Sequence, residues 1–415
     1  MAEETASKQD DTPRVKRRHV FYLPGFDPKG AARYYRLYRE NAPRQAAVSG
    51  YQIAVGPRSV VDQLVTRWTV DFDEQGHKVA TTYDVLRWDD IMRRYWPRGP
   101  YRILWTTVLA TTRHIANGML RKTLEVSWAT FLAAVYPTAM VFGAALAVAF
   151  VASVLSYAAS SIGSPTIVVL AIWAFVFYLA FGPLIGFLQR RFAINWMMAT
   201  YGFNRFHAPG LPELEERLDA LAKRIAEAAC DPENGEVLVV GHSTGAQLGV
   251  STLAKVLKRD PGLARHGPRI SLLTLGGSIP MLAWQKEAQW FRDELTLVAQ
   301  TEDICWIDFT AAQDGACFAL QNPLKICGVK ASEERPKVLS TKLFDMMTPE
   351  TLKRMHRDFA AIHFHYLASS ERKADYDYFA ITAGPKILCS RFAHRETVRQ
   401  FDRFKLKMFK PKPAA

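Results

Sequence analysis

The stretch "EVLVVGHSTGAQLGVSTL", Glu236 to Leu253, decides the fold of this 415-residue chain. It opens with Val237 to Val240, four apolar residues of which three are β-branched, a run typical of a buried strand. From Ala246 to Lys258 the apolar residues recur at helical spacing. Gly241-His242-Ser243-Thr244-Gly245 joins the two segments. The pattern therefore predicts a strand that turns sharply into a helix, with Ser243 at the corner.

A serine at such a corner projects its hydroxyl above the sheet, and the backbone N–H of the following residue points the same way. Gly241 and Gly245 suit this turn because a Cβ atom at either position would collide with the strand or the helix. Ser243 is therefore a candidate nucleophile. The alternative interpretation is a glycine-rich turn with only a structural role.

A second feature is a long segment without charge. Residues 126–189 contain no Asp, Glu, Lys, Arg or His. Because about 20 apolar residues cross the core of a bilayer, the segment predicts two transmembrane spans, at 128–158 and 165–188, joined by a turn. A pair of buried core helices is the alternative, but soluble cores rarely need adjacent helices that are apolar on every side.

The charges that flank these spans predict their orientation. Arg190 and Arg191 follow the second span, and a basic group precedes the first: Arg93, Arg94, Arg98, Arg102, Arg113, Arg121 and Lys122. By the positive-inside rule, both ends of the hairpin lie in the cytoplasm. Trp196 is expected at the membrane interface. Residues 103–119 form either an amphipathic helix on the membrane or an ordinary surface helix.

Outside the hairpin, strand and helix patterns alternate. Strands are expected at 19–26, 67–73, 78–86, 270–275, 295–299, 304–309 and 337–346, and helices at 31–47, 211–229 and from 348. This order predicts an α/β fold with a mostly parallel sheet covered by helices. The predicted segments are a disordered basic arm (1–18), the first part of the domain (19–98), the membrane insertion (99–199), the second part of the domain (200–395) and a basic tail (396–415).

With its glycine-flanked Ser243 between a strand and a helix, the chain resembles the α/β-hydrolase superfamily of serine enzymes, interrupted by a membrane hairpin. The resemblance covers about residues 19–98 and 200–395. It implies a mostly parallel sheet with helices on both faces. It also implies a catalytic triad in which an acid and then a histidine follow the serine along the chain.

The expected acid lies in "ICWIDFTAAQDGACF", residues 304–318. Asp314, in the loop beyond the strand, is preferred, while Asp308 within the strand is the alternative. The expected base lies in "DFAAIHFHYLAS", where His363 is preferred and His365 is the alternative. If this stretch is extended, the two rings face opposite sides, so only one can reach Ser243.

An oxyanion hole needs two backbone N–H donors. The resemblance implies that Thr244 supplies one and that a loop after an early strand supplies the other. "LPGFDP", residues 23–28, occupies that place, and the N–H of Phe26 is the candidate. Pro24 stands where the family usually has a histidine. The alternative is a simple turn that ends the strand.

The remaining sequence motifs, the cysteines and the net charge indicate which cofactors and binding partners to expect. No metal-binding cluster, P-loop or dinucleotide motif is present, so no cofactor and no metal are expected. The five cysteines are odd in number and follow no apparent signal peptide, which predicts reduced thiols in the cytosol. The net charge is +13, and the tail at 401–413 mixes basic and aromatic residues. The tail either contacts anionic lipid head groups or is solvated, and nucleic acid is not expected.

Together these features predict a membrane-anchored serine hydrolase that cleaves carboxylic esters, of lipids or other lipophilic molecules, through a Ser243–His363–Asp314 triad and an acyl-enzyme. An acyltransferase that uses the same site is a close alternative. A non-catalytic membrane scaffold with a hydrolase fold is another.

Overall fold

The computed structural model of the protein describes residues 14–409. Within them nine strands form one mixed sheet in the order β2-β4-β5-β1-β6-β7-β8-β9, with β3 beside β4. The strands are β1 Arg17–Leu23, β2 Gln52–Val55, β3 Ser59–Val60, β4 Val65–Glu74, β5 His77–Leu86, β6 Glu236–His242, β7 Arg269–Leu275, β8 Cys305–Thr310 and β9 Lys337–Ser340. All pairs from β5 to β9 are parallel, and the pairs involving β2, β3 and β4 are antiparallel. The predicted α/β class with a mostly parallel sheet is therefore confirmed.

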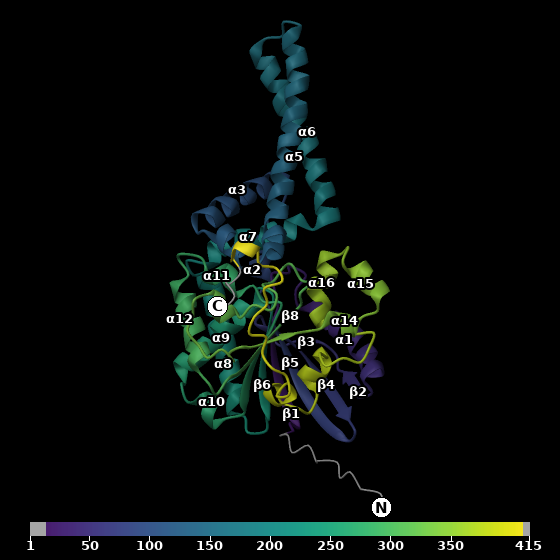
Figure 1. Cartoon of the computed structure of the whole chain (residues 1–415), viewed down its shortest axis with the longest axis vertical. Helices are drawn as coiled ribbons and strands as arrows, with labels where there is room; N and C mark the ends of the chain where they lie inside the picture. Colours follow the sequence, from purple (N-terminus) through teal and green to yellow (C-terminus); the bar gives the residue numbers. More distant parts are fainter. Residues whose placement is uncertain (1–13, 410–415) are drawn as a thin grey trace, which may run out of the picture.

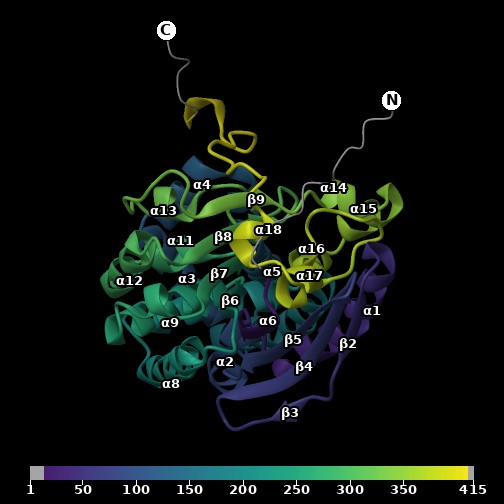
Figure 2. The same cartoon turned by 90° about the horizontal axis from the view of Figure 1, so that it is seen from below.

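Helices cover both faces of this sheet (Figure 2). They are α1 Ala31–Ser49, α2 Asp89–Tyr95, α3 Pro100–Ala116, α4 Met119–Val126, α5 Trp128–Ser161, α6 Thr166–Phe192, α7 Ile194–His207, α8 Pro212–Cys230, α9 Gly245–Arg259, α10 Leu263–His266, α11 Ile279–Ala283, α12 Gln289–Gln300, α13 Pro323–Ile326, α14 Leu343–Met346, α15 Pro349–Met355, α16 Phe359–Phe364, α17 Tyr378–Ala383 and α18 Leu388–Arg391. Short 3₁₀ turns follow at His365–Leu367 and Lys407–Phe409.

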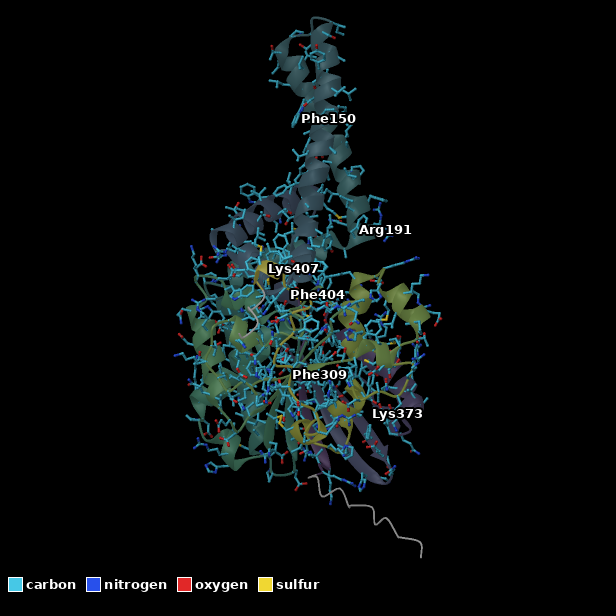
Figure 3. The ribbon with its side chains drawn as sticks, in the orientation of Figure 1. Phe150, Arg191, Phe309, Lys373, Phe404 and Lys407 are labelled. Carbon is cyan, nitrogen blue, oxygen red and sulfur yellow. A yellow bond between two sulfur atoms is a disulfide. The ribbon has the colours of Figure 1, made fainter. Side chains whose placement is uncertain are left out.

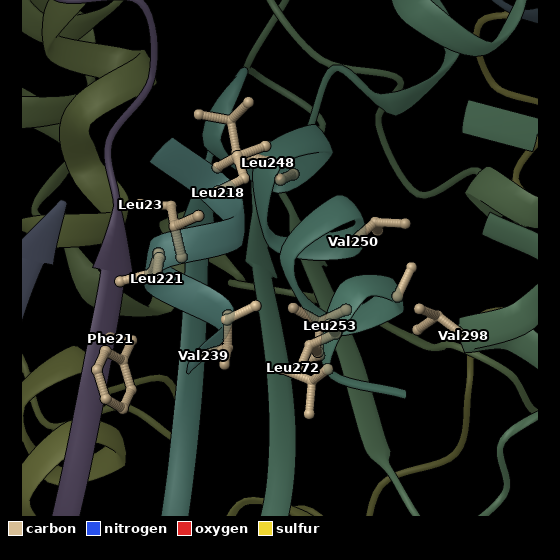
Figure 4. Packing of buried hydrophobic residues seen from close by; sticks show 14 of the residues in the cluster. Phe21, Leu23, Leu218, Leu221, Val239, Leu248, Val250, Leu253, Leu272 and Val298 are labelled. Atoms are coloured by element: carbon tan, nitrogen blue, oxygen red, sulfur yellow. The ribbon is translucent and has the colours of Figure 1, made fainter. Parts of the chain in front are cut away.

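The core on one face joins α8, α9 and α12 to the central strands. Figure 4 shows Leu221 of α8 and Leu253 of α9 directed at Val239 of β6 and Leu272 of β7. All four side chains are fully buried. Complete burial stabilises each such side chain by about 1.5–3 kcal/mol. This packing holds the turn between β6 and α9, which carries Ser243, against the buried core of the domain.

Two expected strands differ from the observed structure. Residues 295–299 lie in the helix α12, because Phe291, Leu295 and Val298 form one buried helical face that a five-residue window cannot reveal. The segment 337–346 is a strand only as far as Ser340 and ends in the short helix α14. The strands expected at 67–73 and 78–86 are confirmed as β4 and β5, which pair as an antiparallel β-hairpin.

The uncharged segment forms two antiparallel helices, α5 and α6, that project from the domain (Figure 1). Their mean hydropathies are 2.3 and 2.4, and both are long and apolar enough to cross a membrane. Large apolar side chains on them, including Leu146, Phe150 and Ile167, are mostly exposed. Exposed apolar surface of this extent is typical of a surface that contacts a membrane or another protein. Each helix continues three or four residues beyond its predicted end.

The basic arm expected at 1–18 is wrong in its last residues, while residues 1–13 lie outside the described structure. Arg14 forms a β-bridge with Lys386, and β1 already begins at Arg17. The guanidinium of Arg18 is fully buried and pairs with Glu236 of β6 at 2.8 Å. Three basic residues in sequence suggested a solvated arm, but this buried carboxylate compensates one of the charges.

The described part of the basic tail, 396–409, packs against the protein. The N–H of Val398 donates to the carbonyl of Val338 in β9, and the N–H of Trp128 donates to the carbonyl of Phe404. Figure 3 shows Phe404 and Lys407 close to the foot of the helical hairpin. The tail thus runs to the first residue of α5, and a fully solvated tail is excluded for these residues. Residues 410–415 lie outside the described structure.

The expectation of reduced thiols is wrong for one pair. Cys305, at the start of β8, forms a disulfide with Cys389 of α18. The two residues are 84 positions apart, and only the packing of α18 beside β8 brings them together. Cys230, Cys317 and Cys327 are free thiols.

Candidate active site

Ser243 lies between β6 and α9 with a φ angle of +59°. Residues other than glycine rarely adopt this left-handed conformation, which costs about 1–3 kcal/mol and persists only where the surroundings impose it. Here the N–H of Ser243 donates to the carbonyl of Leu275 in β7 at 2.9 Å. Its carbonyl accepts from the N–H groups of Ala246 and Ser278. The neighbouring strand and the new helix therefore hold the serine at the corner.

The flanking glycines are required by the close approach of the backbone. A Cβ atom at Gly245 would overlap the carbonyl of Leu23, and one at Gly241 would lie 2.5 Å from the carbonyl of Gly245. A Cβ atom at Gly25 would lie 2.9 Å from Cβ of Ser243. The structure thus brings the loop that holds Gly25 and Phe26 against the serine.

Asp314 and His363 meet at the carboxyl end of the sheet. Nδ1 of His363, near the end of α16, lies 3.0 and 3.2 Å from the two carboxylate oxygens of Asp314. Burial alone would raise the pKa of Asp314, but the charge and hydrogen bond of His363 outweigh it and hold this pKa at about 2. Asp314 is therefore ionised at neutral pH and orients the imidazole. Nε2 of His363 has no hydrogen-bond partner among residues 14–409.

The alternative residues have other partners. Asp308 accepts a hydrogen bond of 2.5 Å from Thr274, and burial raises the pKa of Asp308 to about 7. Nε2 of His365 lies 3.0 Å from Oγ1 of Thr341. The segment is helical rather than extended, so the expectation of opposite faces rested on the wrong conformation. The structure nevertheless pairs Asp314 with His363, as preferred, and not with His365.

Ser243 and His363 line the same small cavity of about 40 Å³. In the part of the chain that the structure describes, no hydrogen bond joins the two side chains. Such contacts are often loose without substrate and shorten in the reacting complex. The volume is enough for water molecules but not for an acyl chain, so a large substrate requires the cavity to open.

The two predicted oxyanion donors lie near this cavity. Within residues 14–409, the N–H groups of Phe26 and Thr244 donate to no backbone carbonyl. The carbonyl of Phe26 accepts a hydrogen bond of 3.0 Å from the indole of Trp196. Both donors remain predictions.

The foot of the hairpin covers this site. The cavity lining includes residues of α5 and α7: Thr130, Ala134, Trp196, Met197, Thr200, Tyr201 and Asn204. Thr130 donates a 3.0 Å hydrogen bond to the carbonyl of Cys317, in the loop that carries Asp314. A Cβ atom at Gly315 in that loop would lie 3.2 Å from Cβ of Ala133. The first turns of α5, the helix of the predicted first span, thus pack on the loop that carries the candidate acid.

Trp196 and Tyr366 are among the residues of the site that were not predicted. Trp196, expected at the membrane interface, lies with its ring 5.4 Å from the His363 ring and bonds Phe26. Tyr366 donates a 3.0 Å hydrogen bond to Asp314 and accepts one from the N–H of Ala311. The only sequence signal for Tyr366 is its place three residues after His363, within one helical turn.

Among the described residues, no cluster of His, Cys, Asp or Glu could hold a metal ion. The chain matches no protein-family model, no curated protein and no solved structure.

Proposed function

We propose that this protein is a membrane-anchored serine hydrolase of the α/β-hydrolase type that cleaves carboxylic esters of lipids or other lipophilic molecules. One observation carries the proposal: a buried Asp314–His363 pair shares a cavity with Ser243, which the backbone holds in a strained conformation. Backbone strain lowers stability and is typical of catalytic sites, so it favours an enzyme over a scaffold without catalytic activity. The roles of the three residues rest on this arrangement and on the resemblance described above.

In the proposed mechanism, Oγ of Ser243 attacks the ester carbonyl and transfers its proton to Nε2 of His363. Asp314 stabilises the resulting imidazolium. The N–H groups of Phe26 and Thr244 bind the oxyanion of the tetrahedral intermediate. His363 then protonates the leaving alcohol, and water attacks the acyl-enzyme with the same residues in reverse.

The residues of α5 and α7 that cover the cavity, here called its roof, support the inference of a lipophilic substrate. Because α5 runs from this roof into the apolar hairpin, an acyl chain in the bilayer would have a short path to Ser243. The same roof limits the access of water. This favours an acyltransferase, in which an alcohol replaces water, as the second candidate.

The proposed topology follows from strand order and charge. Strand β1 pairs with β5, before the hairpin, and with β6, after it, so both flanks share one compartment. The positive-inside rule makes that compartment the cytoplasm. The Cys305–Cys389 disulfide argues for the opposite side, because disulfides persist in oxidising compartments.

The two orientations can be distinguished with single cysteines at Ser161 and at the exposed Ser332, in a background without free thiols. An impermeant thiol reagent added to intact cells should label position 161 and not position 332.

The catalytic proposal is tested by labelling the purified protein with a fluorophosphonate and mapping the modified residue. Ser243 should carry the label. Ser243→Ala should abolish both the labelling and the hydrolysis of a short-chain ester, while the thermal transition of the protein persists. Stoichiometric labelling of another residue would overturn the assignment.

A further inference from the structure

One side-chain amide in the catalytic cavity lacks a partner. Asn204 of α7 is 2% exposed and lines the cavity together with Ser243 and His363. Within residues 14–409, its Oδ1 makes no hydrogen bond. A buried polar group without a partner costs about 1–3 kcal/mol. Because Asn204 also lines the cavity that holds Ser243, its Oδ1 is placed to accept a hydrogen bond from a bound ligand.

Both threonines of the lining are already engaged as donors. Thr130 donates its hydroxyl proton to the carbonyl of Cys317, and Thr200 donates to the carbonyl of Trp196. The remaining lining is largely apolar, with Ala134, Met197, Met281 and Phe318 among its residues. Asn204 thus offers this cavity both an acceptor and a donor.

The hydrogen-bonding capacity of the Asn204 amide limits which chemical group of a ligand can bind it. A phosphate or a carboxylate only accepts hydrogen bonds and would leave Oδ1 of Asn204 unpaired. An alkyl group would leave the whole amide unpaired. A hydroxyl group both donates and accepts, so it can pair with either side of the amide. Because Ser243 and Asn204 share a cavity of about 40 Å³, this hydroxyl must lie within a few atoms of the reacting ester.

We propose that Asn204 binds a substrate hydroxyl next to the ester, so that the preferred substrates are acyl esters of vicinal diols and polyols held in the bilayer. The inference rests on the proposed function and adds the alcohol part of the substrate to it. An ester whose alcohol lacks this hydroxyl would leave the amide buried and unpaired, and sites that bind a hydroxyl discriminate strongly against such analogues.

The test compares two esters of the same fatty acid with the full-length protein in phospholipid vesicles. The 2-hydroxypropyl ester carries the hydroxyl, and the propyl ester lacks it. The wild-type kcat/KM should favour the 2-hydroxypropyl ester by about 10- to 100-fold. In Asn204→Leu, which keeps the branching of the side chain but removes its polar atoms, this ratio should fall to about 2-fold or less. Asn204→Ala serves as the second variant if the leucine variant does not fold.

Asn195→Leu is the matched control. Asn195 is also on α7, and its Oδ1 also lacks a partner among the described residues, but it does not line the cavity. Its ratio should equal that of the wild type. If Ser243 is labelled and both esters are cleaved but the wild type shows no preference, or Asn204→Leu keeps it, the inference is refuted while the proposed function stands. If Ser243 takes no label and neither ester is cleaved, both proposals fail.

Discussion

Replacing Tyr366 with phenylalanine tests whether the acid is held in place by a neighbouring hydroxyl. Burial and the nearby Asp314 raise the pKa of Tyr366 well above its usual value, so the hydroxyl stays protonated and donates to the carboxylate. The variant loses this charged hydrogen bond, worth about 1.5–3 kcal/mol, and leaves the N–H of Ala311 without a partner, at about 1–3 kcal/mol. The free energy of unfolding should therefore fall by about 3–5 kcal/mol, measured by denaturant titration in detergent.

The same variant should also slow the reaction of Ser243 with a fluorophosphonate, by about 10- to 100-fold, because a freer carboxylate misplaces the imidazole. Tyr376→Phe is the matched control. The Tyr376 hydroxyl is equally buried and donates to the carbonyl of Tyr366 at 2.8 Å. Its loss should lower stability and leave the labelling rate unchanged. If Tyr366→Phe unfolds and labels like the wild type, the hydroxyl does not position the acid.

Two further predictions concern histidines. His363→Ala should lower ester turnover by several orders of magnitude, whereas His365→Ala should cost far less because His365 bonds Thr341 rather than Asp314; the reverse result in a turnover assay would exchange their roles. Burial lowers the pKa of His207 to about 4, so the unfolded chain binds more protons between pH 6.5 and 4, and stability falls as the pH drops through that range. His207→Phe removes the contribution of His207 to this pH dependence, which is about 3 kcal/mol. The thermal midpoint of the variant should therefore vary less with pH. An unchanged slope would show that His207 is protonated in the folded state.

The sequence predicted much of the fold because its strongest signals are local. The apolar run at 237–240, the glycines beside Ser243 and the uncharged segment each act within a few residues. The preferred pairing of Asp314 with His363 followed from the triad order that the resemblance implies. Two of the errors arose where long-range packing decides the structure: the Cys305–Cys389 disulfide joins distant segments, and Arg18 is buried only because Glu236 lies beside it.

Long-range packing also explains why some residues of the site were not predicted. Trp196 and Asn204 follow the apolar hairpin in sequence, and their pattern suggests a membrane-proximal helix rather than a catalytic roof. Only the folding of α7 over the carboxyl ends of β6 and β8 places them beside Ser243. No periodicity within α7 carries that information.

The position of β1 between β5 and β6 also dictates an order of biogenesis. The ribosome completes β1, β4 and β5 more than 140 residues before β6, and the whole hairpin emerges in between. Until β6 arrives, one edge of β1 has no neighbour, and an unpaired apolar edge of this kind is prone to aggregate. If α5 and α6 span the membrane as proposed, both are synthesised, and can insert, before β6 closes the sheet. A nascent chain whose hairpin is delayed at the translocation machinery would present its half-sheet to chaperones.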